Sequence, residues 1–187
     1  SERLLNAGVD LALQNFDFAI ARKLAERALE NEPASGVARA QLARVLTAEG
    51  DAISAIAISQ EAAALDPESE RLAYADTLLR LDRMDEARQE LENLLSDSAA
   101  HDEAELRLGK LAYQMGDMAE AGRRFGGLIS SEVAGEAFFY LSSIAERDGR
   151  TDLALEGYSR LAEAGAGLVV RGRAARLLMK EDKRDEA

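Results

Sequence analysis

Few side chains of this sequence could take part in catalysis. The 187 residues contain one histidine, His101, and no cysteine, which excludes a disulfide, a thiol nucleophile and a metal site built on two histidines. His101 lies in a polar stretch, residues 96–102, where we expect a solvated loop side chain. The carboxylates Glu90 and Glu92 are expected to be surface charge. The sequence therefore predicts no catalytic residue, no metal site, no cofactor and no enzymatic activity.

Phosphate and membrane binding are not indicated either. The pair Gly126-Gly127 lacks the Lys-Ser/Thr of a phosphate-binding loop and falls within a predicted helix, where it indicates a close contact or a local weakening. The formal charge is −12, from 35 acidic and 23 basic residues, which argues against a nucleic-acid binder because phosphate contacts need clustered Lys and Arg. No run approaches the ~18 apolar residues of a membrane helix, so we expect no membrane insertion by this segment.

Basic and polar residues nevertheless gather at two places. The members of each cluster are three or four positions apart, which puts them on one face of a helix. The clusters are Arg107, Lys110 and Gln114, and Arg173, Arg176 and Lys180. In an acidic protein, such faces indicate a surface for carboxylates or an acidic peptide. The alternative is ordinary charge alternation, with pairing to Glu and Asp of the same chain.

Three consecutive aromatic residues form another candidate surface. Phe138, Phe139 and Tyr140 cannot all face a core, because successive residues of a helix are rotated by about 100°. Phe139 and Tyr140 are therefore candidates for contact with a partner, since aromatic side chains make good anchors. Packing between neighbouring helices is the other interpretation.

An internal repeat determines the elements that hold these residues. Six alanines, each after a turn, recur at intervals of 34, 32, 34, 33 and 33 residues. They are Ala21, Ala55, Ala87, Ala121, Ala154 and Ala187. A period in the low thirties is typical of a solenoid, and an apolar content of 47% with only two prolines favours helices. In the clearest unit, residues 36–67, Gly50-Asp51 forms the turn between two helices and Pro67 ends the second.

The order of these residues resembles the tetratricopeptide repeat (TPR). The residues that carry the resemblance are Leu42, Ala43, Gly50, Asp51, Ala55, Ala62 and Pro67 in one unit, and Leu108, Gly109, Gly116, Asp117, Ala121, Phe125 and Leu128 in another. The resemblance covers essentially the whole chain. It implies an all-α fold, a right-handed α-α superhelix of about five and a half helix-turn-helix units.

We expect a single TPR array that is a fragment of a longer protein. The units are roughly residues 1–35, 36–67, 68–101, 102–134, 135–167 and 168–187, the last being incomplete. The third unit is two residues short, and we place the shortening in the loop after Pro67. Small residues are expected where helices cross closely, on the first helices as well as in the alanine series. Those of the first helices are Ala43, Ala75, Gly109, Ser142 and Ala175.

In TPR arrays the first helices line a concave groove, and their non-core positions contact the ligand. The resemblance therefore nominates Gln41, Arg44, Asp76, Arg107, Lys110, Gln114, Phe139, Tyr140, Ser143, Arg173, Arg176 and Lys180. It implies a protein-interaction scaffold or adaptor that binds a peptide or helix of another protein. Two alternatives stay open: a structural module that self-associates through its C-terminal end, and a regulatory or substrate-recruiting domain of an enzyme complex whose catalytic part lies outside the segment.

The array is also similar, more narrowly, to long TPR arrays of Gram-negative bacteria. Some of these are outer-membrane adaptor lipoproteins for carboxy-terminal processing proteases, which implies a periplasmic or outer-membrane-associated location. Composition does not assign the compartment, because the absence of cysteine fits the cytoplasm and the periplasm equally.

Overall fold

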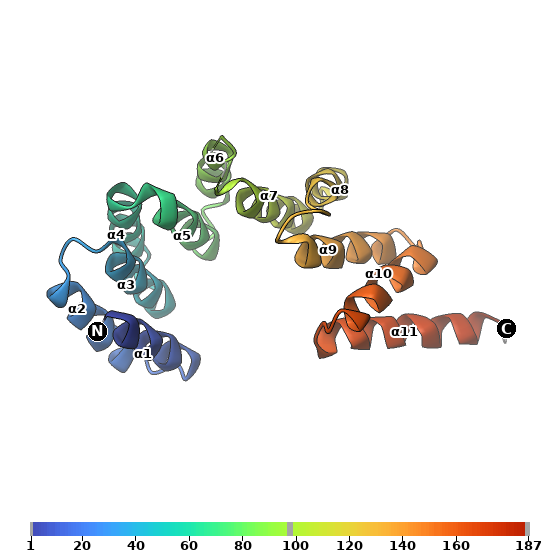
Figure 1. The fold of residues 1–187 in the computed structure, drawn as a ribbon, viewed down its shortest axis with the longest axis horizontal. Helices are drawn as coiled ribbons and strands as arrows, with labels where there is room; N and C mark the ends of the chain where they lie inside the picture. The colour runs from blue at the N-terminus through green and yellow to red at the C-terminus, as the bar shows by residue number, and fades with distance from the viewer. Residues whose placement is uncertain (1, 97–98, 186–187) are drawn as a thin grey trace. The chain divides into compact units, whose positions relative to one another are not determined.

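The protein is helical throughout the part of the chain that the structure describes. That part comprises residues 2–96 and 99–185 of a computed structural model, with side chains for residues 3–67, 69–96 and 99–180. The helices are α1 (Glu2–Gln14), α2 (Phe18–Asn31), α3 (Gly36–Glu49), α4 (Ala52–Leu65), α5 (Pro67–Arg80), α6 (Met84–Leu94), α7 (His101–Met115), α8 (Met118–Gly127), α9 (Ala134–Arg147), α10 (Thr151–Glu163) and α11 (Leu168–Asp185) (Figure 1). This arrangement confirms the predicted all-α fold of paired helices.

The chain divides into two compact units, Ser1–His101 and Asp102–Ala187. In the first unit each helix packs against the next one along the chain from α1 to α6, and α3 also packs against α1 and α5. The first helices of successive hairpins are therefore neighbours. This is the stacking that a helical solenoid requires, because each hairpin buries its apolar face against the adjacent one.

The second unit is built in the same way. Helix α9 packs against α8 and α10, and α10 packs against α11. One apolar cluster lies around Phe125, Leu128 and Ile144. Another lies around Ala154 and Tyr158 and includes residues of α11. The two helices of a hairpin and the next first helix thus share each part of the core.

The turns within the hairpins follow the sequence closely. Gly50 ends α3 with φ +85°, in the left-handed region that glycine adopts without a Cβ clash. The carboxylate of Asp51 then accepts a hydrogen bond from the Ser54 backbone N–H at 3.2 Å, which caps α4. Gly116 and Asp117 repeat this arrangement before α8. The predicted turns at both places are confirmed.

The link between α4 and α5 differs from the prediction. Helix α4 ends at Leu65, and the single residue Asp66 separates it from α5. Pro67 is the first residue of α5, where its missing N–H removes no helical hydrogen bond, and Asp66 accepts from the Ser69 N–H at 3.3 Å. The shortening of this unit therefore lies in the link before Pro67, and the prediction of a shortened loop after it is wrong.

The alanine series lies at the helix crossings as predicted. The five members that the structure describes, from Ala21 to Ala154, are 0% exposed; the sixth, Ala187, lies outside the described residues. On the first helices Ala43 and Ala75 are completely buried. At Gly109 an added Cβ would lie 2.7 Å from the Phe125 ring, so α7 and α8 approach too closely for a larger residue.

The prediction for Ala175 is wrong, and of the two interpretations of Gly126-Gly127 the close contact is excluded. Ala175 is exposed, because α11 turns Val170, Ala174 and Leu177 toward the core and the next position after Ala174 is rotated by about 100°. The pair Gly126-Gly127 does lie in a helix, at the end of α8. A Cβ at either position would meet nothing within 4 Å, so these glycines mark no close contact.

Within the part of the chain that the structure describes, no helix is both long and apolar enough to cross a membrane.

Candidate partner-binding surfaces

The first helices of the first unit line a hollow of about 930 Å³. Helices α1, α3 and α5 and the start of α2 supply its walls, with apolar and polar side chains interleaved. The lining residues are Asp10, Leu13, Gln14, Phe16, Phe18, Arg44, Thr47, Ala48, Ala73, Asp76, Thr77 and Arg80. The predicted candidates Arg44 and Asp76 thus lie at one surface. The hollow is open enough to receive a peptide segment.

Arg44 is held in place across two helices of this hollow. Its guanidinium forms an ion pair with Asp10 of α1, with 2.7 Å between Nη1 and Oδ1, and donates a hydrogen bond to Gln41 Oε1 at 2.8 Å. Sequence reasoning found Gln41 and Arg44 but missed Asp10. The signal was present, since Asp10 precedes Arg44 by 34 residues, one repeat length, and first helices stack at that spacing.

Two further residues of the hollow were missed. Arg80, in the last turn of α5, is exposed, and no ion pair joins it to another described residue. Phe16 lies in the turn before α2 and is 79% exposed, with its ring edge-on to Phe18 at 6.4 Å between centroids. The lining of the hollow therefore includes an exposed cation and an exposed aromatic ring.

The first basic cluster is paired with carboxylates of its own unit. Arg107 forms an ion pair with Glu103 one turn earlier in α7, and Lys110 Nζ lies 2.7 Å from Glu136 Oε1 of α9. Gln114 is exposed near the end of α7. The intramolecular pairing that the sequence left open is thus present at Arg107 and Lys110, and it lowers the positive charge available to a ligand at this face.

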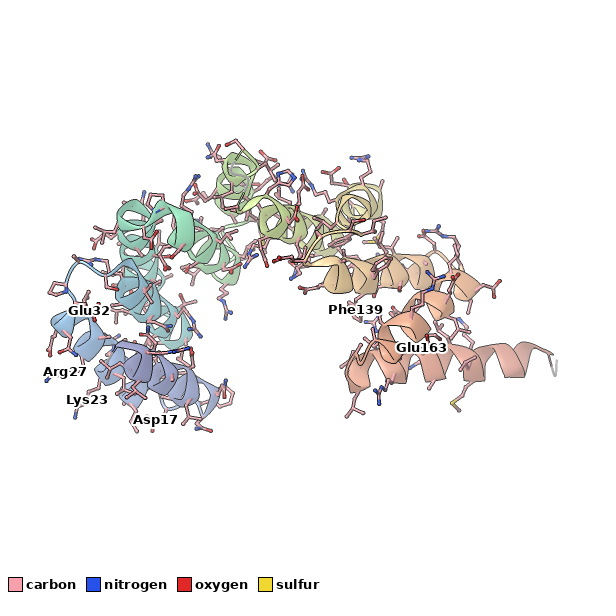
Figure 2. The ribbon with its side chains drawn as sticks, in the orientation of Figure 1. Asp17, Lys23, Arg27, Glu32, Phe139 and Glu163 are labelled. Carbon is pink, nitrogen blue, oxygen red and sulfur yellow. The ribbon has the colours of Figure 1, made fainter. Side chains whose placement is uncertain are left out.

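Phe139 and Tyr140 both lie between helices. Tyr140 stacks on Phe125 with 4.8 Å between ring centroids and meets Tyr113 edge-on at 5.3 Å. Burial is the main cause that raises the pKa of the Tyr140 hydroxyl, followed by the negative charge of Glu136. Phe139 projects from α9 toward α10 and α11 (Figure 2), where its ring centroid lies 6.1 Å from that of Tyr158. The surroundings of Phe139 and Tyr140 match the interpretation that these side chains pack between neighbouring helices.

Arg173 belongs to a polar network inside the second unit. Its Nη1 donates to the Tyr158 hydroxyl at 3.0 Å, to Ser143 Oγ at 3.2 Å and to Glu146 Oε2 at 3.3 Å. The guanidinium also lies over the Phe139 ring. The network joins α9, α10 and α11, so Arg173 and the predicted candidate Ser143 are engaged within the protein.

Arg176 and Lys180 remain exposed at one surface. Together with Glu146, Gly149, Thr151, Leu177 and Met179 they line a hollow of about 450 Å³. No ion pair joins either cation to another side chain among those described. Of the second basic cluster, these two residues are exposed, whereas Arg173 is engaged within the unit.

His101 is the first residue of α7 and not a loop residue, so that part of the prediction is wrong. Its side chain is exposed as expected, and Nδ1 lies 2.9 Å from the carbonyl oxygen of Leu95. Among the residues with described side chains, no three His, Asp or Glu groups converge in a way that could hold a metal ion.

Comparison with family models identifies the repeat. The model described as "Tetratricopeptide repeat" matches residues 72–126 and 106–168, which together span more than half of the chain. The chain therefore belongs to the tetratricopeptide repeat family. A second model, "Anaphase-promoting complex, cyclosome, subunit 3", matches residues 14–94. None of the curated proteins compared matches the chain.

Several solved structures have the same fold. A thermophilic TPR protein of Thermus thermophilus is 21% identical over 96% of this chain and 100% of that chain, with a TM-score of 0.75. PilF of Pseudomonas aeruginosa is 22% identical over 97% and 86%, with a TM-score of 0.72. A chain of the APC/C hetero-tetramer Cut9–Hcn1 is 17% identical over 97% and 37%, with a TM-score of 0.69. At these identities the likeness concerns the fold alone.

Proteins of the TPR class are in general non-catalytic scaffolds for protein interaction. The scaffold role has a physical reason. Each hairpin contacts only its neighbours, so the stacked hairpins present a long, rigid surface made of many side chains.

Proposed function

We propose that the chain is an adaptor that binds a peptide or helix of a partner protein in the hollow lined by α1, α3 and α5. The single observation that carries the proposal is this hollow of about 930 Å³, which is formed by the same helices that the repeat stacks side by side. Peptide segments bind well where apolar pockets alternate with a few fixed polar groups, because the polar groups set the orientation and the apolar ones supply affinity.

The chemistry of the walls favours a partner with carboxylates. Arg80 is exposed and no ion pair joins it to another described residue, whereas Arg44 is paired with Asp10, so Arg80 is the cation that supports a carboxylate ligand. A carboxylate can accept two hydrogen bonds from one guanidinium, which gives a short and oriented contact. Phe16 and Phe18 supply apolar area to the lining of the same hollow. The ligand that fits is an acidic peptide with at least one large apolar side chain.

The hollow beside α11 supports the same preference. Arg176 and Lys180 line it together with the apolar side chains of Leu177 and Met179.

The experiment is affinity capture from the native cell extract with the immobilised chain, read out by mass spectrometry. Ala48 is exposed and lines the hollow, so the substitution Ala48→Trp fills the hollow without disturbing the core. Ala57 is an exposed alanine of α4 that does not line it, so Ala57→Trp is the matched control. We expect the unmodified chain and the control to retain the same partner and Ala48→Trp to lose it.

The charge preference needs a second variant. Arg80→Glu is expected to reduce capture of that partner, with a smaller reduction at high salt because exposed charges are then screened. Unchanged capture by both Ala48→Trp and Arg80→Glu would contradict the proposed site.

A further inference from the structure

The second unit has a further hollow between α8, α9 and α10, which we call the apolar groove. Its volume is about 910 Å³, and most of the side chains that line it are apolar. Phe138 of α9 and Leu153 of α10 belong to this lining and are 39% and 53% exposed. The three helices lie within the array, with α7 before them and α11 after them. Exposed apolar side chains that gather at one hollow mark an interaction surface.

The repeat shows that Phe138 stands where other hairpins have an ion pair. Counting back from Phe138 by the intervals of the alanine series leads to three charged residues. Each of them pairs with the second helix of its own hairpin. The pairs are Glu105 with Arg124 at 2.8 Å, Arg71 with Glu90 at 2.7 Å and Arg39 with Glu61 at 3.4 Å. In α9 a phenylalanine takes this position, so an apolar side chain replaces the charged one at the groove.

Leu153 departs from the repeat in the same way. It stands directly before Ala154, and its counterparts before the three preceding alanines of the series are polar. They are Ser54, Glu86 and Glu120. Two large apolar side chains thus lie at one hollow, at positions that are polar in three other hairpins. Because those hairpins form without an apolar residue at either position, the fold does not require one here.

The polar groups of the groove favour a helix over an extended peptide. Each polar side chain of the lining already has a partner within the unit: Ser142 Oγ donates to the carbonyl oxygen of Phe138 at 2.8 Å, and the four charged side chains form two ion pairs with one another. The backbone N–H and C=O groups of an extended peptide would therefore lose water without gaining a partner. A helix bonds these groups internally and presents only its side chains.

The rim of the groove carries charges of both signs. Arg150 pairs with Asp148 at 2.9 Å, and Arg160 pairs with Glu156, one turn earlier in α10, at 2.6 Å. The side chains of Glu156 and Arg160 are both more than half exposed, so each can also meet an opposite charge of a partner. A matching helix would carry one acidic and one basic residue four positions apart beside its apolar stripe, because opposite charges align the two surfaces.

We infer that the apolar groove docks an amphipathic helix of a partner protein, with large apolar side chains in the groove and flanking charges of both signs. This goes beyond the proposed peptide site, since it uses another surface and a ligand that needs no excess of acidic residues. A second copy fits less well, because two identical hollows that face each other would leave their volume unfilled. A fatty acid also fits less well, because both arginines of the lining are already paired with carboxylates.

The absence of cysteine allows a direct test. A119C places a single thiol at an exposed residue of the lining, and A57C, at an exposed position of α4, is the matched control. The probe is a synthetic helical peptide with a stripe of leucines flanked by Glu and Lys four positions apart. A second peptide has alanine in place of each leucine. We expect the leucine peptide to slow maleimide labelling of A119C alone, and the alanine peptide to slow neither.

A variant of Leu153 measures the contribution of the groove to affinity. L153E introduces the residue that Glu86 and Glu120 supply in other hairpins, in the first turn of α10, where a carboxylate suits the helix dipole. I53E adds the same charge at an exposed apolar residue in the first turn of α4. By fluorescence anisotropy, L153E should bind the leucine peptide about tenfold or more weakly. I53E and Ala48→Trp should bind it like the unmodified chain, and circular dichroism should be unchanged for all three variants.

Several results would overturn the inference. Unchanged labelling of A119C in the presence of the leucine peptide would show that the groove does not bind such a helix. Equal affinity of L153E and the unmodified chain would show that the peptide binds elsewhere. Labelling of A119C that slows as the protein concentration rises would assign the groove to a second copy. Protection of A119C by laurate, without protection by the leucine peptide, would assign it to a fatty acid.

Discussion

The guanidinium carbon of Arg173 lies 5.1 Å from the centre of the Phe139 ring. This contact joins α11 to α9, and the three hydrogen bonds from Arg173 to Tyr158, Ser143 and Glu146 extend it to α10. An arginine and an aromatic residue that sequence reasoning proposed as ligand contacts thus hold three helices of one unit together.

The first prediction concerns this network. Arg173→Met should lower the free energy of unfolding by about 1–2 kcal/mol, because a partly desolvated cation–π contact is lost and the Tyr158 hydroxyl loses a charged donor. Arg176→Met, at an exposed position of the same helix, should change the stability little. Urea denaturation of both variants measures the difference. Equal midpoints would mean that the network does not stabilise α11.

The second prediction concerns the alanine series. Ala121 is completely buried where α8 crosses its neighbours, so Ala121→Leu should overpack the contact and destabilise the protein by about 1–3 kcal/mol. Ala119→Leu on the same helix is the control, since Ala119 is exposed. Thermal unfolding should show a lower midpoint for Ala121→Leu only. An unchanged midpoint of thermal unfolding for Ala121→Leu would exclude the helix register that the alanine series defines.

The third prediction compares two helical glycines whose substitution should have opposite effects. Gly109→Ala would bring a Cβ to 2.7 Å from the ring of Phe125, which is itself completely buried, so we expect destabilisation. Gly122→Ala would place its Cβ in open space, so we expect stabilisation by up to about 1 kcal/mol from the better helix propensity. Chemical denaturation of both variants is the measurement. Stabilisation by Gly109→Ala would contradict the close approach of α7 and α8.

The fourth prediction concerns alkaline pH. Burial is the main cause that raises the pKa of Tyr74, Tyr140 and Tyr158 above the ordinary value of 10.0. Above about pH 10 the tyrosines of the unfolded chain lose protons that the folded chain retains. The free energy of unfolding should therefore be constant below about pH 10 and fall as the pH rises from there through the higher pKa values of the folded protein. Absorbance at 295 nm should show these tyrosines titrating late in the folded protein. If the free energy of unfolding stayed constant up to the pH at which the folded tyrosines begin to titrate, the raised pKa values would be contradicted.

The fold could be predicted from the sequence because its determinants are local and repeated. The turn of Gly50 and Asp51 needs only a residue tolerant of positive φ and a side-chain acceptor next to it, and both are visible in the sequence. The burial of Ala21 to Ala154 follows from the constant period, since each repeat makes the same crossing. The exposure of Ala175 could not be predicted in that way, because burial of a position depends on which helix packs on it.

The candidate sites were less accessible to sequence reasoning, because charge pairing depends on contacts between helices. Lys110 meets Glu136 from another hairpin, and no pattern within α7 reveals that partner. Phe16 was missed because it belongs to no cluster at helical spacing, and Arg80 was missed although it follows the candidate Asp76 by four positions. They become candidates only when the stacking of α1, α3 and α5 brings them to one hollow.

Binding of a partner in the hollow lined by α1, α3 and α5 should change the exchange of backbone amides in these helices. The measurement is hydrogen–deuterium exchange of the chain, with and without the partner captured from the native extract. We expect slower exchange in α1, α3 and α5 on binding, and no such change in the Ala48→Trp variant. Protection confined to other helices, with exchange in α1, α3 and α5 unchanged, would contradict this expectation.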